Sequence, residues 1–144
     1  IEAVPPVAQT GWWDMEWWWD QPNVPEVVSW VKGFRAALHK TPSARHWFAW
    51  VAIHATKMAA EKAKSLKAID LAHAMAGMEL PPDVALQPGK VFFRAGDHQL
   101  MPNIFVGNVH PAQGEDNYFT VADLVPGEKV WPLADTGCHM KYPS

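Results

Sequence analysis

The middle of the chain carries apolar residues at intervals of three and four, the spacing of an amphipathic helix. The first such stretch runs from about Asn23 to His39, and Asn23 is a residue type that caps helices. A second stretch runs from about Ala44 to Lys64 behind the cap residue Ser43, and a third from about Lys67 to Ala76. The pattern therefore predicts three consecutive helices.

The segments on either side of these helices favour strands. Before them, Trp12 to Asp20 is predicted to be one strand with bulky residues on both faces. After them, short apolar runs at about 91–94, 103–110 and 117–124 predict three more strands, the last two joined by a polar hairpin loop. This α/β pattern lacks the alternation of strands and helices that builds a whole parallel sheet. The chain is therefore expected to be incomplete alone.

Composition narrows the class of protein. A chain of 144 residues allows one compact domain, and 49% hydrophobic with 19% charged residues argues against disorder. The net charge of −3 gives no basic surface to attract nucleic acid. No apolar run approaches the roughly 18 residues that a membrane-spanning helix needs. We therefore expect a globular chain that neither binds nucleic acid nor spans a membrane.

Tryptophan is abundant, with nine residues in the chain and five of them between Trp12 and Trp19. One interpretation is an aromatic box that stacks a small molecule, with one or two of Trp12, Trp13 and Trp17 reaching it. The other is that these side chains fill a core or an interface, where large aromatic residues are also common.

Little in the sequence indicates catalysis, a metal or a cofactor. Asp97-His98-Gln99 resembles a catalytic dyad, but no serine or cysteine nucleophile lies at a telling spacing. Cys138 and His139 are soft-metal ligands that no second motif accompanies. No glycine-rich phosphate loop is present either. We therefore expect no enzyme activity, no metal site and no cofactor.

Several segments, taken in order, carry a resemblance to a known family. They are Val31-Lys32-Gly33-Phe34, Pro42-Ser43, the apolar strand Val91–Arg94 running into Asp97-His98-Gln99, and Val125–Lys129. In this order and spacing they resemble the C-terminal part of periplasmic substrate-binding proteins of ABC importers, from the group for branched-chain amino acids, amides and small aromatic acids.

The resemblance implies the C-terminal part of a two-lobed type I periplasmic-binding fold, with residues 1–144 contributing to both lobes. It implies a periplasmic protein that binds a small organic solute in the cleft between the lobes and delivers it to an ABC permease. The other partner would be the N-terminal remainder of the same protein or a complementary chain. An alternative is a small subunit of a heteromeric periplasmic enzyme or sensor built on the same half-fold.

The resemblance also implies ligand-binding residues. The family has a Glu-Gly pair whose carboxylate holds the ligand's ammonium group, and the matching residues are Thr10 and Gly11, followed by Trp12. Because a buried ammonium needs an opposing charge, the threonine favours an uncharged or anionic solute. An aromatic ligand contact at a helix start corresponds to His46, next to Trp47; His46 alternatively only caps that helix. We expect Thr10, Gly11, Trp12, His46 and Trp47 to bind the ligand.

Overall fold

The computed structural model describes residues 3–21, 24–114, 116–130 and 137. The helices are η1 (Pro6–Ala8), α1 (Pro25–Leu38), α2 (Ala44–Ala63), α3 (Ala68–Met75), α4 (Pro82–Ala85) and α5 (Gly127–Val130). The strands are β1 (Gly11–Met15), β2 (Phe92–Phe93), β3 (Leu100–Met101), β4 (Ile104–Val109) and β5 (Phe119–Val125). The predicted order of a strand, three long helices and then strands is confirmed, and the short elements η1, α4, β3 and α5 come in addition.

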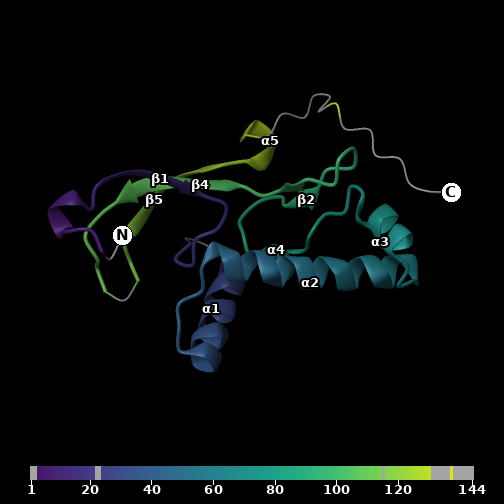
Figure 1. Ribbon diagram of the computed structural model, residues 1–144, viewed down its shortest axis with the longest axis horizontal. Helices are drawn as coiled ribbons and strands as arrows, with labels where there is room; N and C mark the ends of the chain where they lie inside the picture. The colour runs from purple at the N-terminus through teal and green to yellow at the C-terminus, as the bar shows by residue number, and fades with distance from the viewer. Residues whose placement is uncertain (1–2, 22–23, 115, 131–136, 138–144) are drawn as a thin grey trace.

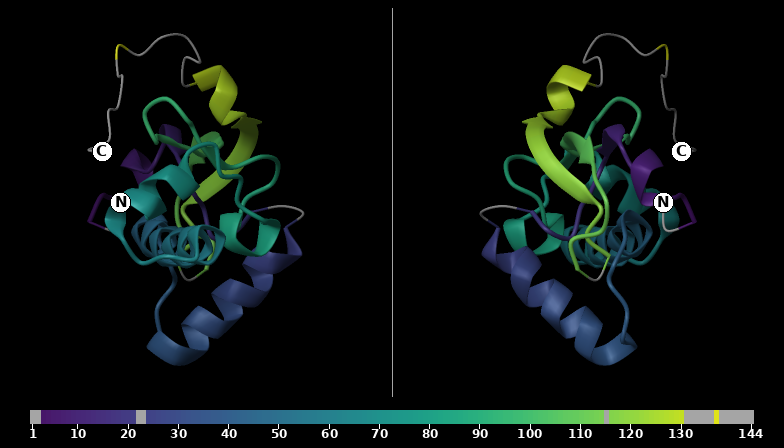
Figure 2. Two further views of the ribbon diagram at one scale, coloured as in Figure 1. Left: turned by 90° about the vertical axis from the view of Figure 1, so that its right-hand side faces the viewer. Right: turned by 90° about the vertical axis from the view of Figure 1, so that its left-hand side faces the viewer.

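The main sheet has three strands in the order β1-β4-β5, and both pairings are antiparallel. It forms one side of the molecule, and α2 lies on the other side with α3 at its far end (Figure 1). A second, two-stranded ladder joins β2 to β3. The helix α1 crosses the start of α2 and projects away from the rest of the chain (Figures 1 and 2).

The two long helices start where the sequence indicates. In α1, Pro25 and Glu26 occupy the first turn, where a fixed φ and a negative charge both suit a helix. Val24 takes the cap position of α1, and Asn23 lies outside the described residues. At the start of α2 the backbone N–H of Ser43 donates to Nδ1 of His46 at 3.0 Å, which closes a capping box.

Two apolar clusters make up the core. The first lies between α1, α2 and α4, and its largest fully buried side chains are those of Trp17, Trp47 and Leu86. The second lies against the sheet and contains Trp13, Trp18 and Phe105. The buried stripe of α2 repeats every fourth residue, through Trp47, Val51, Ala55 and Ala59, and its first three residues belong to the first cluster.

Two carbonyl groups at the end of α4 collect buried hydrogen bonds from distant parts of the chain. The indole of Trp47 donates to the carbonyl of Ala85 at 2.8 Å. The carbonyl of Leu86 accepts from the indole of Trp17 at 2.9 Å and from the amide of Gln21 at 3.1 Å. Since buried carbonyls need partners, these bonds fix the segment after β1, α2 and α4 relative to one another.

The next residues extend this connection to the strands. Gln87 donates from its amide to the carbonyl of Glu16, and its oxygen accepts from the backbone N–H of Asn103 at 3.0 Å. Asn103 in turn donates to the carbonyl of Pro88 at 2.6 Å and accepts from the N–H of Gly127 at 3.1 Å. Gln87 and Asn103 therefore link the segment after β1, the loop after α4 and the start of β4.

The prediction of one strand from Trp12 to Asp20 is wrong beyond Met15, where β1 ends. The carbonyl of Glu16 is bonded by the Gln87 side chain instead of a neighbouring strand. Because the backbone leaves the strand conformation here, the adjacent Trp17 and Trp18 enter different apolar clusters. Within β1 itself the two faces also differ, since Trp13 is buried while Trp12 is 74% exposed.

The indole hydrogen bonds lead to a comparison of two tryptophans on α2. Trp47→Phe removes the donor to the buried Ala85 carbonyl and should lower the free energy of unfolding by about 1–3 kcal/mol. Trp50→Phe is the control, because the Trp50 Nε1 has no acceptor among the described residues and the residue is only partly buried. Urea unfolding of the two variants measures the difference. Equal losses would contradict the role assigned to the Trp47 bond.

Gly107 in β4 permits a close approach of two strands. A Cβ atom there would lie 1.8 Å from the carbonyl oxygen of Thr120 and 2.9 Å from Nε1 of Trp13, beside the irregularity in the β4–β5 register. Gly107→Ala should therefore destabilise the fold by about 1–3 kcal/mol.

Gly96→Ala is the matched control for this substitution. Gly96 lies in the turn between β2 and β3, and a Cβ atom there meets nothing within 4 Å. The added methyl group should leave stability unchanged or raise it by up to about 1 kcal/mol, because alanine restricts the unfolded chain more than glycine does. Thermal unfolding of both variants makes the comparison, and a Gly107→Ala protein as stable as Gly96→Ala would exclude the proposed close approach.

Candidate functional site

The five residues expected to bind ligand lie in two separate places. Thr10, Gly11 and Trp12 lie at the start of β1, an edge strand, where Trp12 is paired with Asn108 and largely exposed. His46 lies in the first turn of α2, and Trp47 beside it is fully buried in the first apolar cluster. No hydrogen bond or ring contact joins the two groups among the described residues. Their role in ligand binding stays a prediction.

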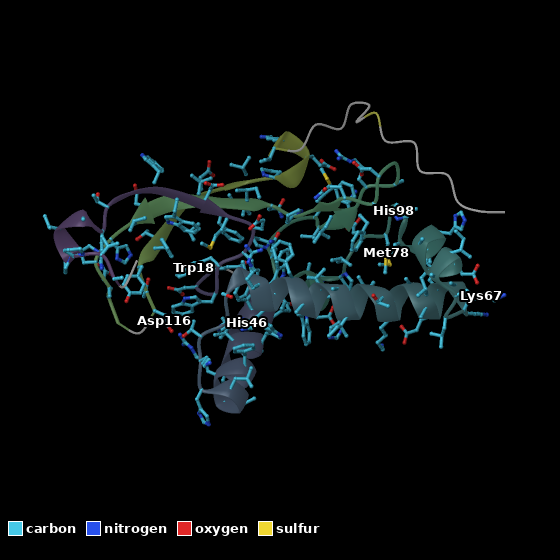
Figure 3. The ribbon with its side chains drawn as sticks, viewed as in Figure 1. Trp18, His46, Lys67, Met78, His98 and Asp116 are labelled. Carbon is cyan, nitrogen blue, oxygen red and sulfur yellow. The ribbon has the colours of Figure 1, made fainter. Side chains whose placement is uncertain are left out.

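A hollow of about 560 Å³ opens beside the start of α2. Its volume is in the range of small-molecule sites. We call it the aromatic hollow, and its lining residues are Ala3, Trp18, Trp19, Thr41, Pro42, Ser43, Asp116, Tyr118 and Phe119. Figure 3 shows Trp18 and Asp116 close to the end of α2 that carries His46.

The aromatic wall of this hollow is built by rings that pack on one another. The ring centre of Trp18 lies 4.9 Å from that of Phe119, in an edge-to-face arrangement, and 5.6 Å from that of Trp19. The indole of Trp19 donates to the backbone carbonyl of Asp116 at 3.3 Å. These contacts hold the segment after β1 against the start of β5, which closes one side of the hollow.

Arg35 contacts two residues that line the hollow, Trp19 and Thr41. Its guanidinium lies 4.4 Å from the ring centre of Trp19, a cation–π distance, and donates to the hydroxyl of Thr41 at 3.1 and 3.3 Å. Arg35 therefore connects α1 to both Trp19 and the Thr41-Pro42-Ser43 segment that leads into α2.

Few polar groups face this apolar wall. Among the residues that the structure describes, Asp116 is the only lining residue with a charged side chain, and Thr41 and Ser43 supply hydroxyls. The Nε1 of Trp18 is buried and has no acceptor among the described residues. The N-terminal end of α2 adds the positive end of a helix dipole, which favours a negative group. The arrangement suits a flat apolar molecule that carries hydrogen-bonding groups at its ends.

None of the three tryptophans that the sequence offered for an aromatic box lines the hollow, since Trp13 and Trp17 fill the core and Trp12 faces outward. The hollow is lined instead by their neighbours Trp18 and Trp19. Tyr118, Phe119 and Asp116 were missed as lining residues. The only signal for them was their position at the start of a predicted strand, and nothing local indicates that this strand start lies beside the tryptophans.

The turn that contains Asp97 and His98 has a different construction from a catalytic dyad. Arg94 donates to the two carboxylate oxygens of Asp97 at 2.9 and 2.6 Å, and Asp97 also accepts from the N–H of Gln99 at 3.1 Å. Chiefly because of the hydrogen bond from Arg94, the pKa of Asp97 is lowered from 3.8 to about 2. Asp97 therefore stabilises the turn, and Figure 3 shows His98 far from Asp116 of the aromatic hollow.

In the described part of the chain, no group of three or more His, Cys, Asp or Glu side chains is arranged to hold a metal ion. Cys138 and His139, the soft-metal pair of the sequence, lie outside the described residues. Among the described helices, none combines the length and hydrophobicity needed to cross a membrane.

Comparison with known proteins identifies the family. The sequence model described as "Periplasmic binding protein" matches residues 2–115. The chain therefore belongs to the periplasmic binding protein family, and it has part of the type I periplasmic-binding fold. This confirms the family resemblance and the fold class. No curated protein sequence matches the chain.

Solved structures show the same fold at low sequence identity. An ABC-type branched-chain amino acid transporter from Rhodopseudomonas palustris CGA009 has a TM-score of 0.67 and 23% identity, covering 82% of this chain and 31% of that one. A branched-chain amino acid ABC transporter periplasmic ligand-binding protein from Burkholderia xenovorans LB400 has a TM-score of 0.76 and 15% identity, covering 91% and 34%.

A third structure contains a bound ligand. It is a solute binding protein of an ABC transporter from Rhodopseudomonas palustris BisB5 in complex with 3,4-dihydroxy benzoic acid, with a TM-score of 0.72 and 16% identity, covering 87% of this chain and 33% of that one. The chain thus spans about a third of the length of each of these proteins.

The Arg94–Asp97 pair predicts a specific acid dependence of stability. Because the pKa of Asp97 is lower in the folded state, the pair stabilises the fold fully above the ordinary value of 3.8, and this contribution is lost as the pH falls toward about 2. Asp97→Asn should therefore flatten the pH dependence of unfolding in this window, and Arg94→Gln should flatten it similarly. Urea midpoints at several pH values test this, and an unchanged slope in both variants would refute it.

Proposed function

We propose that residues 1–144 are the C-terminal segment of a two-lobed periplasmic binding protein and contribute to both lobes. This protein binds a small organic solute between its lobes and delivers it to an ABC-type importer, without catalysing a reaction. The observation that carries the proposal is the match of the family model to residues 2–115 on a chain with the corresponding fold. Its partners are the permease and the solute.

The size of the solved neighbours supports the two-lobed assembly. Since 82–91% of this chain superposes on about a third of each neighbour, most of a complete binding protein lies outside these residues. We propose that the N-terminal remainder, in the same polypeptide or as a complementary chain, supplies the rest of both lobes and the other wall of the solute site. The assembled protein works in the periplasm, where the importer receives its solute.

The aromatic hollow supports a solute with a flat apolar body. Its ring stacks against Trp18 and Phe119, and a carboxylate or amide group lies toward Ser43, at the positive end of the α2 dipole. Ring hydroxyls can donate to the carboxylate of Asp116, which lines the same hollow. Dihydroxybenzoic acid, the ligand of one structural neighbour, has this combination of groups.

The family resemblance adds residues to this proposal. Thr10 stands where the family has a carboxylate, so the site lacks the usual partner of an ammonium group and favours an uncharged or anionic solute. His46 lies one helical turn from Ser43 but does not line the aromatic hollow, so its contact with the solute stays a prediction of the family resemblance. Small carboxylates, amides and alcohols are the proposed solute class.

Calorimetric titration of the assembled two-lobed protein tests this function. We expect it to bind 3,4-dihydroxybenzoate and to bind leucine weakly or not at all. Asp116→Asn should reduce the affinity for dihydroxybenzoate by about ten-fold, since it weakens hydrogen bonds to an ionised acceptor, and should change benzoate binding less.

Leu66→Ala is the control for this titration, because Leu66 is 86% exposed and does not line the aromatic hollow. Its dihydroxybenzoate affinity should equal that of the unmodified protein if the solute lies in the hollow. Tight leucine binding without any response to dihydroxybenzoate or benzoate would refute the proposed solute class. The absence of binding to every small solute tried would refute the function itself.

A further inference from the structure

A second apolar surface lies between α1 and α2, apart from the aromatic hollow. It is a groove of about 510 Å³, which we call the α1–α2 groove, and it is lined by Ser29, Trp30, Gly33, Phe34, His46, Ala49, Trp50 and Ile53. Within the described ranges of the chain, no residue lines both this groove and the aromatic hollow. No lysine, arginine, aspartate or glutamate of those ranges lines the groove.

The aromatic rings of the groove form a continuous floor. The ring centre of Trp30 lies 5.4 Å from that of Phe34 and 5.8 Å from that of Trp50. The ring centres of Phe34 and His46 are 4.8 Å apart. At the open end Ile53 is 71% exposed. An exposed apolar surface of this kind marks an interaction site on a soluble protein.

The sequence of α2 indicates that its groove-facing side packs against another element. One face, with Trp47 and Val51, is buried against α4 and the first apolar cluster. The face with Ala49, Trp50 and Ile53 is also apolar, although it faces the groove. A helix that is apolar on two faces is typical of a helix packed between two layers.

The helix α1 also has apolar side chains that no other described element buries. Its buried residues are Val27 and Val31, whereas Val28 and Leu38 are exposed apolar side chains. In Figures 1 and 2 the helix stands out from the body of the molecule, and no element of the described chain covers its outer side. Such a projecting helix pair needs further packing to bury its apolar surface.

We propose that the α1–α2 groove is the docking surface for an apolar element of the N-terminal remainder of the two-lobed protein. The inference rests on the proposed function, and it assigns the contact between the two parts to named residues. About two thirds of each solved neighbour lies outside the part that this chain covers. A complete protein of this fold therefore has further helices and strands that can cover the groove. The element packs on Trp30, Phe34 and Trp50 and covers Ile53.

Cysteine labelling in the assembled two-lobed protein tests the docking surface. Ile53→Cys and Leu66→Cys are compared with Cys138 replaced by serine in both. Leu66 is the matched control, an apolar side chain that is 86% exposed and lies outside the groove. Both thiols should react with a maleimide at equal rates in denaturant, and in the folded protein Ile53→Cys should react at least about ten-fold more slowly than Leu66→Cys.

Two outcomes would overturn the assignment. Equal rates at the two positions in the folded protein would show that the groove is not covered by the N-terminal remainder. Protection of Ile53→Cys that disappears on dilution would identify a second copy of the protein as the occupant instead. The labelling requires no solute: a protected Ile53→Cys in a protein that binds no solute refutes the proposed function alone, and a reactive one in a solute-binding protein refutes the docking surface alone.

Discussion

The need to satisfy two buried carbonyl groups organises this chain. The carbonyls of Ala85 and Leu86 end the short helix α4 inside the first apolar cluster, where water is not available to them. The carbonyl of Ala85 accepts from the indole of Trp47, which lies 38 residues away in sequence. The carbonyl of Leu86 accepts from the indole of Trp17, which lies 69 residues away. Because an unpaired buried carbonyl destabilises a fold by about 1–3 kcal/mol, these bonds fix the positions of the segment after β1 and of the helix α2 relative to α4.

The same constraint positions the aromatic hollow. With Trp17 fixed against Leu86, the next residue, Trp18, is directed to the sheet, where it packs on Phe119. Trp19 then spans the space between Arg35 of α1 and the backbone of Asp116 before β5. Three consecutive tryptophans thus serve the core, the sheet and the rim of the hollow, which explains why this segment is not a regular strand.

The long elements could be predicted from the sequence because their signals are local. Apolar periodicity, the Ser43 cap and the Pro25-Glu26 pair define helices without any knowledge of the rest of the chain. The end of β1 at Met15 could not be predicted, since it depends on the Gln87 side chain that bonds the Glu16 carbonyl. Tyr118 and Phe119 were missed for the same reason: Phe119 is placed by its pairing with Val109 and Tyr118 by the hydrogen bond that its carbonyl accepts from the N–H of His110, and a local pattern specifies neither.

The central claim is that the hollow beside the start of α2 contributes to a solute site in a two-lobed binding protein. The indole N–H signals of the nine tryptophans, assigned in nitrogen-15 NMR spectra by single Trp→Phe variants, report on it directly. On addition of 3,4-dihydroxybenzoate to the assembled protein, the signals of Trp18 and Trp19 should shift, while the signal of Trp17, bonded to Leu86 in the core, should stay unchanged. Saturating solute that shifts neither the Trp18 nor the Trp19 signal would contradict this account.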